Sequence, residues 1–380
     1  MGKGKYLKKV KVSLGKKIFR VVLVILLVLV ILIGAVAAFV WSKLGKITYD
    51  DGSLKETVSA IAPTTAELEV DPTDAVDATG DNGEVTATET TPLETEPAQS
   101  LDMSGLDMTD APAYSSGELF KDEDVMNILV VGTDERTEGF VNNCRGDLNI
   151  LISINKSEGT VKLVSFSRGI AIKMLDGPYA GQYEWLTNAH RWASKEAILQ
   201  AMEEAFKIEC DRYVRVNFNT VRKVVDAIGG IDIEMTQAEA DEMNAHRRQE
   251  FFEGVNHLHG GYALDYARLR AVDDDWGRIA RQRKVILAAV EKLKGSSFST
   301  LNDLCDMVLP LIQTNLTKLE IAELILYSPK FLQSEFDQMT IPIANSYGGM
   351  TVMSGVGGWA LNYEKNNAAL HEFLFGTDAE

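Results

Sequence analysis

Charged side chains gather where three apolar runs of the sequence begin or end. The runs cover residues 127–132, 148–154 and 161–166, and the charged residues beside them are Asp134, Arg136, Arg145, Asp147 and Arg168. Open α/β sheets bind ligands in crevices at the ends of their strands. Each of these residues taken singly is more often a solvated loop charge, but five of them at neighbouring strand ends predict a site.

A second group of arginines lies near the start of a predicted helix. Arg278 and Arg281 are three residues apart and point to one helix face, and Arg268 and Arg270 lie just upstream. A helix N-terminus favours anions, and guanidinium groups bind phosphate through paired hydrogen bonds. In the alternative reading, these arginines pair with the acidic run 273–275 and only stabilise a loop. Spacing alone does not decide between the two.

Carboxylates combined with arginines are typical of phosphoryl-transfer sites. Mg²⁺ or Mn²⁺ binds through one or two carboxylates and substrate phosphate oxygens, so Asp134 and Asp147 are the predicted metal ligands. Such a transfer depends on positioning and charge neutralisation and needs no covalent residue. The five histidines show no ligand spacing, which argues against zinc. Cys144 lies beside Arg145, which could lower its pKa, but without a partner base we interpret it as a bystander.

Strand and helix patterns alternate from residue 126 onward, which predicts an α/β fold with a sheet, possibly of mixed strand directions, covered by helices. Besides the three runs above, strands are expected at 213–218 and 231–235, and helices at 194–207, 220–228, 262–268, 278–293, 301–312, 319–326 and 360–375. The glycine-rich stretch 348–358 lacks a strand-to-helix setting for a phosphate loop, and a turn or hairpin is the better interpretation.

The N-terminal part of the chain is predicted to be a membrane anchor. Residues 1–20 hold eight Lys/Arg and no acid, and the run from Val21 to Val40 is uncharged and long enough, at about 1.5 Å per residue, to span a bilayer as a helix over 21–41. The basic flank keeps that end in the cytoplasm and places the rest outside. A cleaved signal peptide is the alternative, but the apolar run exceeds the usual length of such peptides.

Acidic residues dominate the rest of the chain, which carries a net charge of -17 overall. Residues 42–125 are rich in Thr, Ala, Pro, Asp and Glu and lack hydrophobic periodicity, so we expect a disordered acidic tether. Nucleic acid is excluded as a partner because its recognition requires a basic surface. Any bound anion must therefore meet a local cluster of arginines or a metal ion.

Seven segments in this order resemble the LytR-CpsA-Psr family of cell-wall phosphotransferases. They are Asn127–Arg136, Arg145–Asp147, Leu163–Arg168, Asp211–Phe218, Val225–Ile233, Ala263–Arg270 and Asp275–Gln282. The resemblance covers about 170 residues and places a catalytic domain at 126–295. Residues 296–380 have no useful match and are expected to form a helical extension.

The resemblance implies a fold, a reaction and residue roles. The implied fold is a central mixed sheet with helices on both faces and an apolar pocket for a polyprenyl chain. The implied reaction transfers a glycopolymer, such as a teichoic acid or capsular polysaccharide, from a polyprenyl-pyrophosphate carrier to peptidoglycan. Asp134 and Asp147 match the family's metal-binding carboxylates, and Asp275 matches a loop carboxylate. The pyrophosphate-binding positions are Arg145, Arg168, Arg268, Arg270, Arg278, Arg281 and Gln282, of which Arg168 and Arg278 also count as catalytic together with the three aspartates.

Three positions depart from the family pattern. Ser167 stands where the family usually has Pro, Gly169 where it has Asp, and Leu148 where it has Thr. Two other functions therefore remain open: a lipid-pyrophosphate hydrolase that uses water as the acceptor, and a non-catalytic scaffold or regulator that binds polyprenyl phosphates. The polymer, the acceptor hydroxyl and the oligomeric state are not specified by the sequence.

Overall fold

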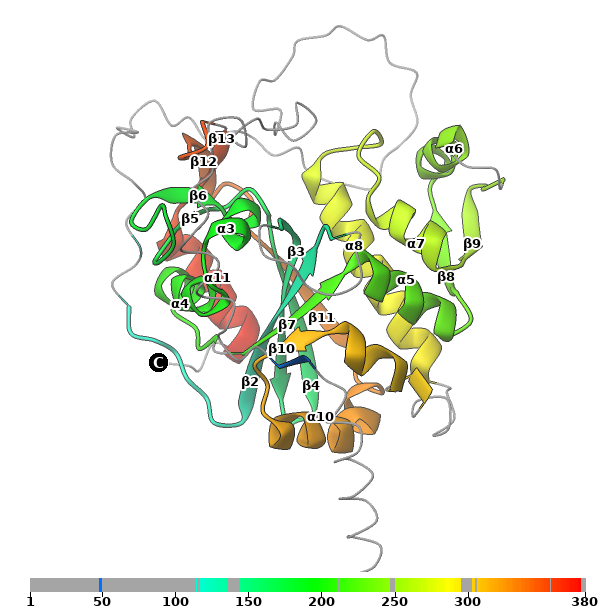
Figure 1. Ribbon diagram of the computed structural model, residues 1–380, viewed down its shortest axis with the longest axis horizontal. Coiled ribbons are helices and arrows are strands. Elements are labelled where there is room, and N and C mark those ends of the chain that lie inside the picture. Colours follow the sequence, from blue (N-terminus) through cyan, green and yellow to red (C-terminus); the bar gives the residue numbers. More distant parts are fainter. Residues whose placement is uncertain are drawn as a thin grey trace, which may run out of the picture. The chain divides into compact units, whose positions relative to one another are not determined.

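The computed structural model describes residues 48–49, 114, 117–135, 144–210, 212–246, 250–294, 303–304, 306–355 and 357–376 (Figure 1). All of them belong to the unit that covers Ile47–Glu380. The predicted basic segment 1–20 and the predicted membrane span 21–41 lie outside these residues, as does most of the predicted tether. Thr48–Tyr49, within the expected disordered tether, instead form a strand of the central sheet. Within the described part of the chain, every helix is too short or too polar to cross a membrane.

A seven-stranded mixed sheet forms the centre of the fold, in the order β1-β10-β7-β2-β3-β4-β11. Its strands are β1 Thr48–Tyr49, β2 Val125–Thr133, β3 Gly146–Asn155, β4 Thr160–Phe166, β7 Arg212–Asn217, β10 Gln313–Thr314 and β11 Phe336–Ile341. The β2–β3 and β3–β4 pairs are antiparallel, whereas β2–β7 and β4–β11 are parallel. The apolar runs of β2, β3 and β4 are buried because helices and loops cover the sheet, which confirms the predicted mixed α/β class.

Strand register brings the predicted site residues together at one end of the strands β2, β3 and β4. Thr133 pairs with Gly146 after a register shift that begins at Gly132, so the end of β2 lies beside the start of β3. A Cβ atom on Gly132 would lie 2.9 Å from Cβ of Leu148, which explains why glycine is required at this close approach. The end of β4 lies at the same end of the sheet, since Ile150 of β3 pairs with Ser165.

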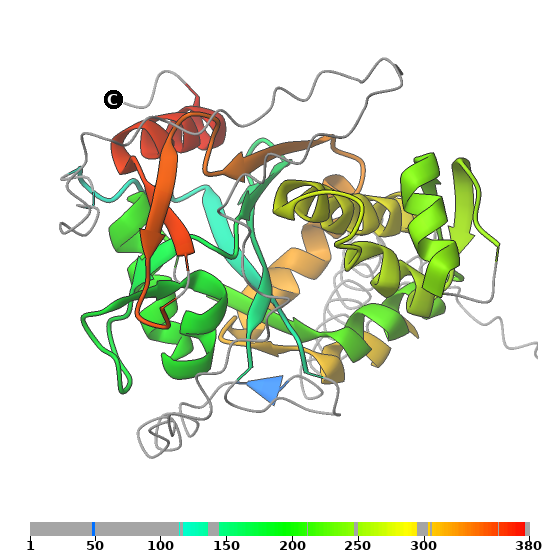
Figure 2. The ribbon, with the colours of Figure 1, turned by 90° about the horizontal axis from the view of Figure 1, so that it is seen from above.

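Helices pack on both sides of the sheet, as Figures 1 and 2 show. On one side lie α3 Leu186–Trp192, α4 Lys195–Phe206 and α11 Tyr363–Phe375, which share the main hydrophobic core with the strands. On the other side, α5 Phe218–Ala227, α6 Gln237–His246, α7 Gly260–Ala267 and α8 Asp275–Lys294 surround the hairpin of β8 Ile231–Met235 and β9 Gly254–Leu258. This second group has its own buried core.

The C-terminal region contributes strands as well as helices, which differs from the expected helical extension over 296–380. Strands β10 and β11 complete the central sheet, and α10 Lys318–Phe331 begins at a capping box formed by Thr317 and Glu320. The glycine-rich stretch forms the predicted hairpin, with β12 Tyr347–Thr351 antiparallel to β13 Gly357–Leu361. A second small hairpin joins β5 Ala171–Lys173 to β6 Tyr183–Trp185. Within the helix expected over 301–312, residues 309–311 form a short 3₁₀ helix.

A buried ion pair fixes the end of β2 just beside the site. The Arg215 Nη2 atom of β7 lies 2.6 Å from Oε1 of Glu135, and both side chains are almost fully buried. The Thr133 hydroxyl donates to the other Glu135 oxygen, and Arg215 also donates to Oε1 of Gln313 in β10. These bonds join three neighbouring strands at the position where the chain leaves β2.

Breaking this ion pair is expected to destabilise the protein strongly. Arg215→Met leaves the Glu135 carboxylate buried without its cation, which should cost about 3–5 kcal/mol in the free energy of unfolding. The double variant Glu135→Gln/Arg215→Met removes both charges and should recover part of that loss. Urea unfolding of the purified full-length chain measures both values. A loss below about 1 kcal/mol in the single variant would contradict the structural role of the pair.

Candidate functional site

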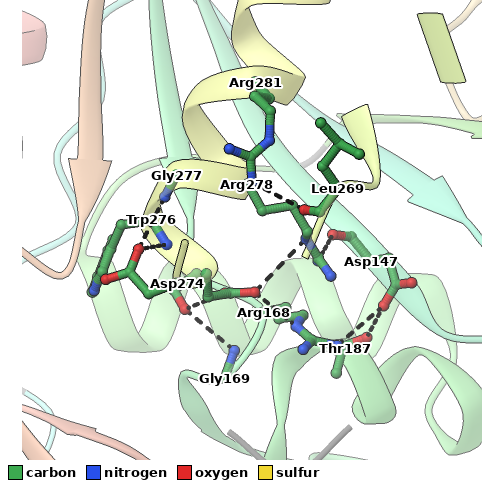
Figure 3. A network of polar contacts seen from close by, with 12 residues as sticks. Asp147, Arg168, Gly169, Thr187, Leu269, Asp274, Trp276, Gly277, Arg278 and Arg281 are labelled. Carbon is green, nitrogen blue, oxygen red and sulfur yellow. Dashed lines mark hydrogen bonds and ion pairs between the residues drawn. The ribbon is translucent and has the colours of Figure 1, made fainter. Parts of the chain in front are cut away.

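Two arginines and two carboxylates from three segments meet at the ends of the inner strands of the sheet (Figure 3). The Arg168 Nε atom, from the loop after β4, lies 3.0 Å from Oδ1 of Asp275, and Arg168 Nη1 lies 3.8 Å from Oδ1 of Asp147. Arg278 of α8 lies 3.7 Å from Asp275 through its Nε atom and donates from Nη2 to the Asp147 carbonyl at 3.0 Å. The predicted strand-end and helix-start groups thus form one cluster, which we call the arginine–carboxylate cluster.

Asp134 and Arg145 form a second, more exposed pair beside this cluster. The Arg145 backbone N–H donates to Oδ1 of Asp134 at 3.1 Å, and the Arg145 Nε atom lies 3.5 Å from Oδ2. Both side chains are about one quarter to one third exposed. Arg136 lies outside the described residues. The close approach of β2 and β3 therefore places Asp134 next to Asp147.

The pKa values of Asp134 and Asp147 are shifted in opposite directions by their surroundings. Burial, followed by the nearby charge of Asp147, raises the pKa of Asp134. Burial also opposes ionisation of Asp147, but Arg278, Arg168, Arg145 and Arg270 outweigh it, so the pKa of Asp147 lies below its usual value. Burial lowers the pKa of Arg278 to about 10, which leaves this side chain cationic at neutral pH.

Asp134 and Asp147 are a donor set that fits Mg²⁺. Among the described residues, no group of three or more His, Cys, Asp or Glu side chains could enclose a metal ion. Magnesium uses few protein carboxylates and completes its coordination with water and phosphate oxygens. The charge of Asp147 raises the pKa of Asp134, and a cation held by both carboxylates would offset this repulsion. A donor set of oxygens alone suits magnesium better than zinc, which favours His and Cys ligands.

The remaining predicted residues divide into two groups. Arg268, Arg270 and Gln282 lie near the cluster, where Arg268 and Arg270 are exposed and the Arg268 guanidinium lies 4.5 Å from the Phe218 ring centroid. Arg281 instead pairs with both oxygens of Asp273 at 2.7 and 2.6 Å and is 3% exposed. The loop-pairing alternative from the sequence therefore describes Arg281, and in part Arg278, whose Nε atom lies 3.7 Å from Asp275.

A pocket of about 760 Å³ opens beside these residues. Its polar part is lined by Asp134, Arg145, Asp147, Arg268, Arg270, Arg278 and Gln282, and its apolar part by Leu148, Val216, Phe218, Val221, Leu264, Val285 and Ile286, among others. The pocket lies between the central sheet and the helices of the second core. Arg168, Asp275 and Arg281 do not line it.

Helix α3 supplies two residues that the sequence analysis missed. The Thr187 hydroxyl donates to Oδ1 of Asp147 at 3.2 Å. Below it, the buried His190 ring bonds to Oδ1 of Asn149 at 2.8 Å, and a Cβ atom on Gly146 would lie 2.3 Å from that ring. No sequence motif indicates these residues, because only the packing of α3 against β3 brings Thr187 to Asp147 and His190 to Asn149.

Cys144 fits the interpretation as a bystander, but its pKa moves against the direction suggested by the sequence. Burial, followed by the charge of Glu135, raises the pKa of the thiol to about 12. A protonated thiol is a weak nucleophile and a poor metal ligand.

The mixed sheet and its covering helices define an α/β protein with a charged site at the strand ends. The chain belongs to the LytR_cpsA_psr family, whose sequence profile matches residues 81–369.

Curated relatives carry transferase names. The chain is 29% identical over 218 residues to the polyisoprenyl-teichoic acid–peptidoglycan teichoic acid transferase TagU of Bacillus mycoides, covering 55% of this chain and 66% of the relative. It is 26% identical over 254 residues to the similarly named TagV of Bacillus subtilis, covering 65% of this chain and 64% of the relative. The matches thus span slightly less than two thirds of the relatives' own lengths.

Solved structures share the fold. TagT of Bacillus subtilis aligns with a TM-score of 0.52 at 22% identity, over 70% of this chain and 96% of that chain. Protein gbs0355 of Streptococcus agalactiae aligns with a TM-score of 0.55 at 22% identity, over 66% and 88%. At this identity the likeness concerns the fold.

Replacing the two carboxylates is expected to change stability in opposite directions. The raised pKa of Asp134 means that its ionised form is less stable in the folded chain than in the unfolded chain, so Asp134→Asn should raise the free energy of unfolding by about 0.5–2 kcal/mol. The lowered pKa of Asp147 stabilises the fold above the unfolded pKa, and Asp147→Asn should cost about 1–3 kcal/mol because it leaves the arginines uncompensated.

Urea unfolding at pH 7, with a chelator present, measures both changes. The stability difference between the wild type and Asp147→Asn should shrink as the pH falls below about 4, where Asp147 becomes protonated in the unfolded and then in the folded chain. Equal losses in the two variants would rule out the opposite environments.

Proposed function

We propose that this chain is a membrane-anchored, magnesium-dependent phosphotransferase that moves a glycopolymer from a polyprenyl-pyrophosphate carrier to peptidoglycan. The observation that carries the proposal is the pocket, because one part is lined by arginines and carboxylates and the other by aliphatic side chains. A lipid pyrophosphate has the same division between a charged head and an apolar chain. The names of the curated relatives support the same substrates.

The apolar part of the pocket is suited to the prenyl chain of the carrier. Leu148 lies at the junction between the two parts, directly after Asp147. Its departure from the usual family Thr therefore extends the apolar lining toward the charged end. The Thr187 hydroxyl of α3 donates a hydrogen bond to Asp147 and so supplies a polar contact beside Leu148.

The charged part is suited to hold and orient the pyrophosphate. Arg278 faces the pocket and is held by Asp275 and the Asp147 carbonyl, so its guanidinium is fixed before any ligand arrives. Exposed Arg268 and Arg270 line the same part and would bind further phosphate oxygens. A magnesium ion bound by Asp134 and Asp147 would offset phosphate charge during transfer.

In the proposed reaction, an acceptor hydroxyl oxygen forms a bond to the phosphorus next to the polymer. The bond from that phosphorus to the bridging oxygen breaks, and the polyprenyl phosphate leaves with the electron pair while the hydroxyl proton passes to solvent. The chain's residues contribute position and charge, which is how phosphoryl transfer is generally catalysed. A predicted N-terminal anchor, with this domain outside the cytoplasm, would place the site where a bilayer-bound carrier and the wall meet.

Reconstituted transfer tests the proposal. The purified full-length chain is incubated with a lipid-linked glycopolymer and peptidoglycan oligomers, with magnesium or with a chelator. We expect polymer-linked peptidoglycan only when magnesium is present. Phosphate release without linkage would instead indicate a hydrolase, and lipid binding with neither product would indicate a scaffold; both results overturn the transferase proposal.

Removing the Arg278 guanidinium should abolish most of this activity. Arg278→Ala is expected to lower the transfer rate by about a hundredfold or more, because a preorganised charge is lost at the phosphate. Arg222→Ala is the matched control, since Arg222 is an exposed arginine of α5 that does not line the pocket. An unchanged rate in Arg278→Ala would contradict its assignment.

A further inference from the structure

Three aromatic side chains form a row beside the arginine–carboxylate cluster. The ring centroids of Trp276 and Tyr347 are 5.6 Å apart at an interplanar angle of 51°, and those of Tyr347 and Trp359 are 5.2 Å apart at 71°. All three side chains are partly exposed. We call these residues the aromatic row; it joins the start of α8 to the β12–β13 hairpin.

Both ends of the row are hydrogen-bonded to residues that neighbour the cluster in the chain. Trp276 directly follows Asp275, and its backbone N–H donates to Oδ1 of Asp274 at 3.0 Å (Figure 3). The Trp359 backbone N–H donates to the carbonyl of Gly169, the residue after Arg168, at 2.8 Å. The row therefore lies directly against the segment that carries Arg168.

Gly169 is needed for this arrangement. A Cβ atom at that position would lie 3.0 Å from Nε1 and 3.1 Å from Cδ1 of Trp359, so a larger side chain would push the indole away. The departure of Gly169 from the usual family Asp thus coincides with a tryptophan that occupies the same space. The N–H edge of the Trp359 indole stands where the family pattern has a carboxylate.

The hairpin that carries Trp359 is firmly held. The Ser354 backbone N–H donates to Oε2 of the buried Glu184 at 2.9 Å, and the Ser354 hydroxyl donates to Oε1 at 3.0 Å. The Met353 backbone N–H donates to the carbonyl of Tyr183. These bonds fix the hairpin loop to the segment before α3, so the row is preorganised for a ligand.

The aromatic row lies outside the pocket that fits the lipid carrier. Asp147 and Arg278 line the lipid-sized pocket, whereas Arg168, Asp275 and all three aromatic residues do not. In phosphoryl transfer, the attacking and leaving oxygens lie roughly in line on opposite sides of the phosphorus. If the leaving polyprenyl phosphate occupies the pocket, the attacking hydroxyl comes from outside it, where the row lies.

We propose that the aromatic row binds a sugar ring of the acceptor glycan and delivers its hydroxyl to the phosphate held by the cluster. This inference rests on the proposed transferase function. Tryptophan and tyrosine rings present flat apolar faces with polar edges, which match the C–H face and the hydroxyl rim of a pyranose. The exposed carboxylate of Asp274, beside Tyr347, is placed to accept hydrogen bonds from sugar hydroxyls.

Direct binding of acceptor fragments tests the row separately from catalysis. The full-length chain is titrated calorimetrically with oligosaccharides released from peptidoglycan by a muramidase. Trp276→Ala is expected to weaken binding by about tenfold or more, which corresponds to about 1.4 kcal/mol, and Trp276→Phe should retain most of it because a ring remains. Tyr327→Ala removes an exposed aromatic ring of α10 and is the matched control.

Transfer kinetics give a second measurement. Trp276→Ala should raise the KM for the acceptor with little change in kcat. Wild-type binding that is lost in Trp276→Ala supports the row even if no transfer is detected, in which case only the transferase proposal fails. No oligosaccharide binding by the wild type, or equal binding by wild type and Trp276→Ala, would overturn the row while leaving transfer itself to the reconstituted assay.

Discussion

The ionised carboxylate of Asp147 is the group on which the rest of the site depends. It is poorly hydrated, and it stays charged because Arg278, Arg168 and Arg145 lie around it. The dependence is mutual, since Arg168 and Arg278 are themselves buried and need Asp147 and Asp275 as counter-charges. Two buried cations thus have two carboxylates beside them, and the excess positive charge available to a ligand comes from the exposed arginines at the pocket.

The division of the molecule into two cores explains why a pocket exists at this place. The strands and helices α3, α4 and α11 share one core, whereas α5 to α8 pack around the β8–β9 hairpin in another. Side chains from both sides of this boundary, such as Val216 of β7 and Ile286 of α8, line the pocket. A cavity between separately stabilised cores can remain open without weakening either one, which suits a site that must admit a long apolar chain.

The sequence was sufficient for features that depend on local patterns and insufficient for those that depend on distant packing. The apolar runs predicted β2, β3 and β4, and the charges at their ends predicted the cluster. The two residues of β10 and the polar strand β11 were not foreseen, because their partners lie far away in the chain. Likewise, the meaning of Gly169 depends on Trp359, and the role of Arg281 depends on which carboxylate it meets.

The parallel pairing of β11 with β4 also has a consequence for the folding of the chain during its synthesis. Residues 336–341 are the last strand of the central sheet along the chain, and they pair with the edge of residues 161–166 that β3 leaves open. A chain made from its N-terminus must therefore keep β4 without its second neighbour, β11, until residue 341 has been synthesised. An unpaired edge strand can associate with other chains, so this segment needs protection during biogenesis. A shortened chain that ends after α8 would carry that exposed edge permanently.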